Sequence, residues 1–321
     1  MQRRDFLAAA MATAAGTAFA QGSYPSKTIR FIVPFPPGGG TDTTSRMIAE
    51  KFSTLLGWNV IVDNKPGAGG NIGLDAVAKA APDGYTIGMG QASNLAINPS
   101  LYAKMPFDPL KDLTPIAGIA DQPVVLVVRP DSPLKTLADF VQAAKAEPGR
   151  MRLAQAGNGT VGHLAGELLA RRAGIQLLQV PYKGAGPAMT DLLGGQVETY
   201  FGSSVSVMGQ LAAGKVRALA LSSARRIGAL PNVPTVAELG YPGFDASTWL
   251  GLVGPAGMPA DIVTRINTET VKILARPEVK EKLLHEGSEA TPGTPQQFAA
   301  YIRAEHGKWG TLIREANIRI E

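Results

Sequence analysis

Two glycine-rich stretches are the residues of this chain best suited to chemistry, and the chemistry they suit is anion binding. Residues 34–42 read Pro-Phe-Pro-Pro-Gly-Gly-Gly-Thr-Asp, and residues 156–163 read Ala-Gly-Asn-Gly-Thr-Val-Gly-His. Glycines let a backbone approach a ligand closely, because no Cβ stands in the way. Each stretch follows an apolar run and precedes a helical pattern. The unpaired N–H groups and partial positive charge of a helix start would therefore face an anion at each one.

Thr41 and Asp42 stand where the first of these helices should begin. The Thr41 hydroxyl is placed to donate a hydrogen bond to an anion. Asp42 has two interpretations: an acid in the first turn that complements the helix dipole and ties down the glycines, or a direct contact to the ligand. We favour the first.

The second stretch contains a literal G-x-G-x-x-G at residues 157–162, the pattern of dinucleotide sites. Such a site also needs an acidic residue about 20 positions further on. The next predicted strand ends in Gln-Val-Pro-Tyr-Lys at residues 179–183, without an acid. A dinucleotide is therefore disfavoured, while a smaller anion remains open. His163 either contacts that ligand or is a packed or capping histidine, which we favour.

Catalytic patterns are incomplete. Ser132-Pro133-Leu134-Lys135 matches S-x-x-K, but the companion S-D-N and K-T-G elements are missing, and Ser132-Pro133 is typical of a turn. The sequence has no cysteine and no G-x-S-x-G, and its three histidines are too far apart for a metal cluster. We expect no catalytic centre, no metal and no cofactor.

The elements that must position the two turns predict an α/β protein. Strands are expected at 29–33, 58–62 and 85–89, helices at 43–56 and 71–80, and a polar loop at 91–94. This βαβαβ order with short turns is typical of a doubly wound parallel sheet. The apolar run 124–128 predicts a crossing into a second lobe.

The second half of the chain repeats this architecture. Strands are expected at 151–154, 175–180, 197–201 and 216–221, and helices at 137–146, 164–172, 186–193 and 204–213. Residues 249–253 predict a return to the first lobe, followed by helices at 260–274, 277–285 and 295–316. Ligands of open α/β sheets lie at the carboxyl ends of strands, so two facing lobes would direct two helix starts into one cleft.

Composition and the N-terminus indicate an exported protein of two domains. The chain has 321 residues, with 37 Gly, 24 Pro and 18% charged residues. Residues 1–20 read as a twin-arginine-type signal peptide, with Arg3-Arg4 at the start and Ala18-Phe19-Ala20 at the cleavage site; the alternative is an amphipathic helix. Cleavage would leave 29 basic and 25 acidic residues, a net charge of +4 that is scattered along the chain. We expect a soluble periplasmic protein that binds no nucleic acid.

Five motifs in order resemble one family. They are the residues at 33–42, 64–73 (Asn-Lys-Pro-Gly-Ala-Gly-Gly-Asn-Ile-Gly), 96–99 (Ala-Ile-Asn-Pro), 156–163 and 180–184 (Val-Pro-Tyr-Lys-Gly). The chain resembles, over its whole mature length, the Bug family of substrate-binding receptors of tripartite tricarboxylate transporters. The resemblance implies a type II periplasmic-binding-protein fold: two doubly wound α/β lobes joined by two crossover strands, with the ligand cleft between them. Lobe 1 would comprise residues 21–124 and 245–321, and lobe 2 residues 125–244.

The resemblance also implies a function. The protein would be a monomeric, non-catalytic receptor that captures a small carboxylate and delivers it to membrane permease subunits. An exported enzyme and a ligand-sensing subunit of a membrane signalling system are the alternatives. The ligand-binding positions that it implies are Phe35, Gly39, Gly40, Thr41, Asp42, Ser93, Asn94, Asn158, Gly159, Thr160 and His163, together with Gly202 and Ser203.

Position 202 departs from the family's pattern. Many relatives resemble Phe-Asp-Asn after the strand at 197–201, and that Asp can meet the ammonium group of an amino acid. Here the residues are Phe201-Gly202-Ser203-Ser204. Because Gly202 offers no carboxylate, we expect a non-amino mono-, di- or tricarboxylate, aliphatic or aromatic.

Overall fold

The computed structural model describes residues 24–315 and residue 318. The predicted signal peptide and Ala316, the predicted end of the last helix, lie outside the described residues. Among the helices that the structure describes, none has the length and apolarity needed to cross a membrane.

One group of parallel strands carries the first glycine-rich turn. β1 (Ile29–Val33) lies between β2 (Val60–Asn64) and β3 (Thr86–Gln91). The connecting helices are α2 (Gly40–Leu56) and α3 (Asn71–Ala78). Every β1 side chain except Arg30 is buried. The parallel βαβαβ unit predicted from the sequence is therefore confirmed, with α2 beginning at Gly40, just before the expected start at Thr41 or Asp42.

A second parallel group carries the other turn. β5 (Arg152–Gln155) lies between β6 (Leu178–Pro181) and β7 (Thr199–Ser203). Its helices are α5 (Leu137–Ala146), α6 (Val161–Ala173), α7 (Ala185–Leu193) and α8 (Ser204–Ala212). Thr136 and Asp139 form a capping box at the start of α5, and the Ser132 hydroxyl accepts a hydrogen bond from the Leu134 N–H. The S-x-x-K match is thus a turn before a helix.

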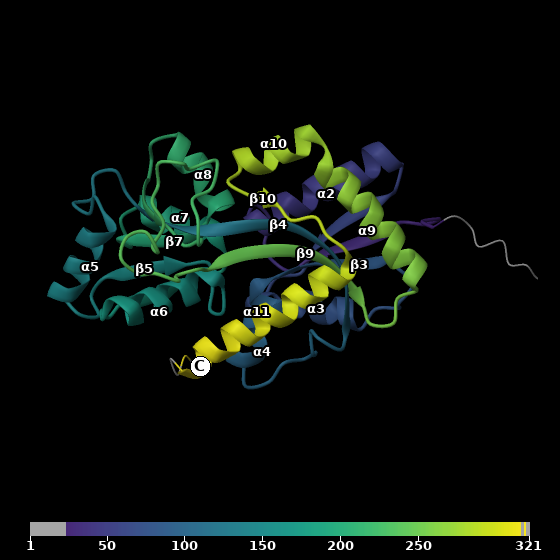
Figure 1. Ribbon diagram of the computed structural model, residues 1–321, viewed down its shortest axis with the longest axis horizontal. Coiled ribbons are helices and arrows are strands. Elements are labelled where there is room, and N and C mark those ends of the chain that lie inside the picture. Colours follow the sequence, from purple (N-terminus) through teal and green to yellow (C-terminus); the bar gives the residue numbers. More distant parts are fainter. Residues whose placement is uncertain (1–23, 316–317, 319–321) are drawn as a thin grey trace, which may run out of the picture.

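Two long strands join the groups, and Figure 1 shows them running side by side through the middle of the molecule. β4 (Leu113–Val128) pairs along its first part with β9 (Ser247–Pro255) and along its last part with β7 and β8 (Arg217–Leu221). The sequence predicts only residues 124–128 and 249–253 of these strands. Pro115, Gly118 and Pro123 interrupt the apolar pattern of β4. The pairing with β9 shifts register near Pro115 and Gly118, whereas Pro123 stays in register opposite Ser247.

In the part of the chain that the structure describes, five helices cover the two faces of the first strand group (Figure 1). α3 and α11 (Pro295–Glu315) pack on one face, and α2, α9 (Ala260–Ala275) and α10 (Pro277–His285) on the other. The short elements are helical turns at Ala68–Gly70 and Ser93–Ile97, α4 (Asn98–Leu101) and β10 (Glu289–Ala290). The sequence predicts a polar loop at residues 91–94, whereas a helical turn begins there at Ser93. The Asn94 side chain accepts a hydrogen bond from the Gln91 N–H at 3.0 Å, which ties the start of this turn to the end of β3.

Candidate functional site

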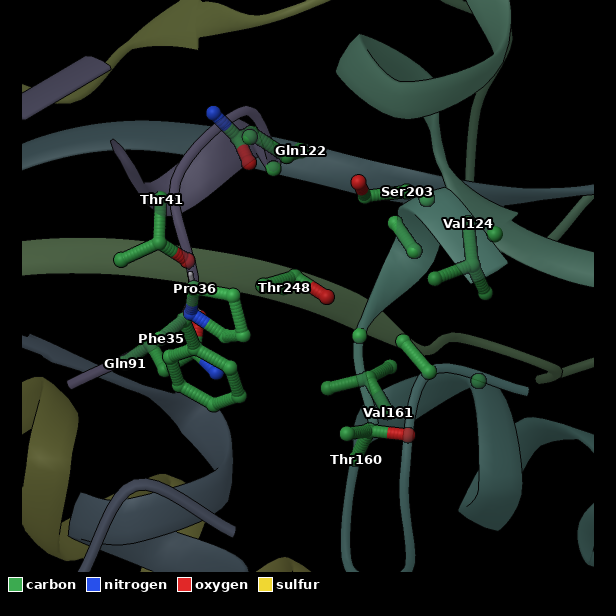
Figure 2. A pocket seen from close by; sticks show the side chains of 18 of the residues that line it. Phe35, Pro36, Thr41, Gln91, Gln122, Val124, Thr160, Val161, Ser203 and Thr248 are labelled. Carbon is green, nitrogen blue, oxygen red and sulfur yellow. Dashed lines mark hydrogen bonds between the residues drawn. The ribbon is translucent and has the colours of Figure 1, made fainter. Parts of the chain in front are cut away.

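A cleft lies where the two strand groups face each other, and it contains about 760 Å³ of space, part of it open to solvent. Figure 2 shows Phe35, Pro36, Thr41 and Gln91 on one side and Thr160, Val161 and Ser203 on the other. Gln122 and Thr248, which are opposite each other in the β4–β9 register, form its floor. A second hollow adjoins the cleft, sharing Phe35, Thr160 and Lys183 and adding Tyr102 and Tyr182.

Four helices begin at the cleft: α2, α6, α7 and α8. Residues at or beside each start line the cavity. The residues that precede α2, α7 and α8, which are Gly39, Gly184 and Ser203, make no side-chain cap. Backbone N–H groups at these starts are therefore available to an anion. The two glycine-rich turns predict the contributions of α2 and α6, but no motif predicts those of α7 and α8.

Asp42 holds the first glycine-rich turn together. One carboxylate oxygen accepts hydrogen bonds from the Gly38 N–H and Arg46 Nε, both at 3.0 Å, and the other accepts one from Asn64 Nδ2 at 2.9 Å. Burial alone would raise the pKa of Asp42, but the hydrogen bonds from Arg46, Gly38 and Asn64 keep it below its usual value. Asp42 is buried and does not line the cleft. This geometry agrees with the favoured interpretation of Asp42 as a residue that ties down the glycines.

Thr41 lines the cleft and begins a chain of hydrogen-bonded polar side chains. Its hydroxyl donates to Gln91 Oε1 at 2.8 Å, and Gln91 Nε2 donates to Ser93 Oγ at 2.8 Å. Gln91, rather than Ser93 or Asn94, forms the wall, and those two predicted residues lie behind it. The one sequence signal for Gln91 is its place at the carboxyl end of a parallel strand.

The second glycine-rich turn is organised by its own side chains. The Thr160 hydroxyl donates to the Gly157 carbonyl at 2.7 Å, and the Gly159 N–H donates to His163 Nδ1 at 3.3 Å. Burial lowers the pKa of His163 to about 4, so the ring is a neutral acceptor at pH 7. Thr160 lines the cleft and Asn158 the adjoining hollow, whereas Gly159 and His163 lie behind them.

The two predicted binding glycines differ in what surrounds them. Gly159 has φ +77°, and a Cβ there would lie 2.5 Å from Asn98 Oδ1, so the fold itself requires glycine. A Cβ on Gly39 would meet nothing closer than the Pro36 carbonyl oxygen at 4.0 Å. Gly39 can therefore be changed to probe the cleft without straining the backbone.

The end of β7 completes the site with neutral groups. Gly202 and Ser203 line the cleft beside Tyr200, whose ring is fully buried. Burial raises the pKa of Tyr200 to about 12, which keeps the phenol protonated. Among the described residues that line the cleft and the adjoining hollow, the only charged side chain is that of Lys183.

Comparison with known proteins places these features in context. A model of the tripartite tricarboxylate transporter family receptor matches residues 44–318. Protein BugT of Bordetella pertussis is 39% identical over 300 residues, which is 93% of this chain and 92% of that protein. The periplasmic binding protein BugD has a similar structure, with a TM-score of 0.87 and 35% identity over 93% of this chain and all of that one. This similarity confirms the predicted two-lobe fold.

Two further structures contain ligands. The Rhodopseudomonas palustris protein Rpa4515 with adipate has a TM-score of 0.89 and 34% identity, covering 92% of this chain and 99% of that one. MatC from the same species, with bound malate, has a TM-score of 0.85 and 32% identity, covering 90% of this chain and all of that one. Adipate and malate are both small dicarboxylates.

Proposed function

The chain belongs to the tripartite tricarboxylate transporter receptor family, whose relatives include the Bug proteins, and on that premise we propose that it captures a small non-amino carboxylate. It is a periplasmic solute receptor by family. The finer proposals are that it closes on the acid between its two lobes and delivers it to the permease subunits of a tripartite transporter. We further propose that it works as a monomer and is exported by the twin-arginine route.

The observation that carries the proposal is the convergence of four helix starts on a cleft lined by no acidic side chain among the described residues. Backbone N–H groups and hydroxyls can bind a carboxylate without a paired cation, because the helix dipoles supply partial positive charge. The adipate and malate held by two relatives support the same class of ligand.

Close approaches across the cleft support a closing mechanism. A Cβ on Gly40 would lie 3.1 Å from Val205 Cβ, and one on Gly184 would lie 3.5 Å from Pro36 Cγ. In each case the glycine is on one side of the cleft and its neighbour is on the other. A ligand that contacts both sides only when they are together would favour the closed form by that difference in affinity.

The alternatives receive less support. An exported enzyme would need a nucleophile or an acid–base pair in the cleft, whereas His163 is buried behind the turn and the Ser132–Lys135 pattern is a turn. A sensing subunit would share this fold and differ only in its partner. Capture of membrane proteins on the immobilised receptor would separate a permease from a kinase.

A thermal-shift panel tests the proposed ligand class. The acids are succinate, L-malate, adipate, citrate and benzoate, with L-aspartate and L-glutamate as amino-acid counterparts. An acid at 100 times its dissociation constant should stabilise the protein by about 2.7 kcal/mol. Stabilisation by L-aspartate or L-glutamate, without a response to any non-amino acid, would contradict the proposal.

A further inference from the structure

The side chain of Gln122 is fully buried on β4 and lines the cleft. Its Nε2 donates to Thr44 Oγ1 at 3.0 Å, which anchors the amide to α2. Its Oε1 accepts no hydrogen bond from the residues that the structure describes. A buried acceptor without a donor is costly, and because Gln122 lines the cleft, a donor on a bound ligand would satisfy it.

Gln122 Oε1 lies at a corner where three elements meet. A Cβ on Gly40, the first residue of α2, would lie 2.9 Å from Gln122 Oε1 and 3.3 Å from Ser203 Oγ. Figure 2 shows Gln122 and Ser203 near each other at one end of the cleft, with Thr160 at the other end. Ser203 comes from β7 on one side of the cleft, and Gln122 comes from the floor strand β4 and is hydrogen-bonded to α2 on the other side, so a group bound here would connect the two sides.

The partial charges around Gln122 Oε1 and Ser203 indicate which chemical group of a ligand can bind between them. The partial positive charge at the start of α2 favours the amide oxygen, rather than the amide nitrogen, on that side. A carboxylate has no hydrogen to donate to this oxygen, whereas a hydroxyl can donate to Oε1 and accept from the Ser203 hydroxyl. The nearby cleft residues Thr41, Ser203 and Thr248 are also neutral.

We propose that Gln122 and Ser203 recognise a hydroxyl group, so that the captured acid is a hydroxycarboxylate. This inference rests on the proposed function, because it assigns one end of the same cleft. It adds a specificity-determining pair that the glycine-rich motifs do not contain.

Matched acids that differ by one hydroxyl test the inference. Calorimetry would compare L-malate with succinate, 2-hydroxyglutarate with glutarate, and 3-hydroxybutyrate with butyrate. The native protein should bind the hydroxy acid of at least one pair 10-fold or more tightly than its partner. Gln122→Met, which keeps the side-chain length, and Ser203→Ala should each reduce that ratio to 3-fold or less, mainly by weakening the hydroxy acid.

Gln179→Met is the matched control, since Gln179 is a half-buried glutamine on β6 that does not line the cleft. It should preserve the ratio. Equal binding of both acids in every pair, or an unchanged ratio in both Gln122→Met and Ser203→Ala, would overturn this inference and leave the proposed function standing. Ser203 is only half-buried, so its variant tests the inference even if Gln122→Met fails to fold. Failure of the native protein to bind any of the six acids or any acid of the thermal-shift panel would overturn the proposed function as well.

Discussion

The ring of Tyr200 occupies the space that a side chain on Gly202 would need: a Cβ at position 202 would lie 2.2 Å from Tyr200 Cε1 and 2.7 Å from its hydroxyl oxygen. The two residues are two apart on β7 and therefore face the same side of the sheet. This finding adds a physical reason to the predicted non-amino ligand. Position 202 carries no carboxylate, and the space that such a side chain would need is filled by the neutral ring of Tyr200.

Gly202→Asp should destabilise the protein by about 1–3 kcal/mol, because the new Cβ must displace a buried ring. Urea unfolding measures the loss. Adding Tyr200→Ala should remove the clash, so that the double variant is more stable than the sum of the two single changes predicts. Strict additivity of the two changes would show that the ring and position 202 do not compete for space.

Gly40→Ala should weaken carboxylate binding by roughly 10-fold or more, because its Cβ would lie 3.1 Å from Val205 Cβ on the other side of the cleft and would oppose closure. Ligand-free stability should fall by about 1–3 kcal/mol, because the same Cβ would lie 2.9 Å from the buried Gln122 Oε1. Calorimetry gives the affinity, and small-angle scattering reports whether ligand still compacts the molecule. Gly209→Ala on α8, where a Cβ meets nothing within 4 Å, is the control. Native affinity in Gly40→Ala would rule out closure through this contact.

His163 should make the protein lose stability in acid. Its folded pKa, about 4, lies below the unfolded value near 6.5, so its contribution is complete above pH 6.5 and is lost as the pH falls toward 4. The shift corresponds to roughly 3 kcal/mol. His163→Asn, which keeps an acceptor for the Gly159 N–H, should lessen the loss of unfolding free energy between pH 7 and 4.5. The exposed control His285→Asn should not, and equal pH slopes in native protein and His163→Asn would refute this role.

Asp42→Asn distinguishes the two possible roles of Asp42, which are holding the turn together and contacting the ligand. Loss of its charged hydrogen bonds to Gly38 and Arg46 should cost about 1–3 kcal/mol of unfolding free energy. Removing a negative charge in direct contact with an anion would tighten binding, and we expect no tightening. A higher carboxylate affinity in Asp42→Asn, measured by calorimetry, would contradict the turn-holding role.

Local patterns predicted most of the fold, because each strand and helix of the two parallel groups carries its own periodicity. They could not predict the first half of β4, where prolines and glycine dilute the apolar pattern. The site residues also divide into those that a local motif predicts and those that it does not. Thr41 and Thr160 follow from glycine-rich turns, whereas Gln122 and Thr248 reach the cleft through a β4–β9 register between residues 126 positions apart. No local signal encodes that register.

The sequence also could not show which predicted residues line the cleft and which lie behind its wall. Ser93, Asn94 and His163 belong to the right loops, but hydrogen bonds within each loop place them behind the wall. Whether they influence the ligand stays a prediction, as do the lobe boundaries at 124/125 and 244/245.

Calorimetry on Gly39→Val, with the acid that gives the largest thermal shift in the native protein, tests most directly whether the cleft binds a carboxylate. Gly39 lines the cleft at the start of α2, and its backbone, at φ −82° and ψ 167°, accepts valine. Gly307→Val, on an exposed turn of α11 where a Cβ meets nothing within 4 Å, is the matched control. Native protein and control should each bind one acid per chain. Gly39→Val should bind the acid at least 100-fold more weakly, with little change in its ligand-free melting temperature. Native affinity in Gly39→Val would place the ligand outside this cleft and contradict carboxylate binding at the start of α2.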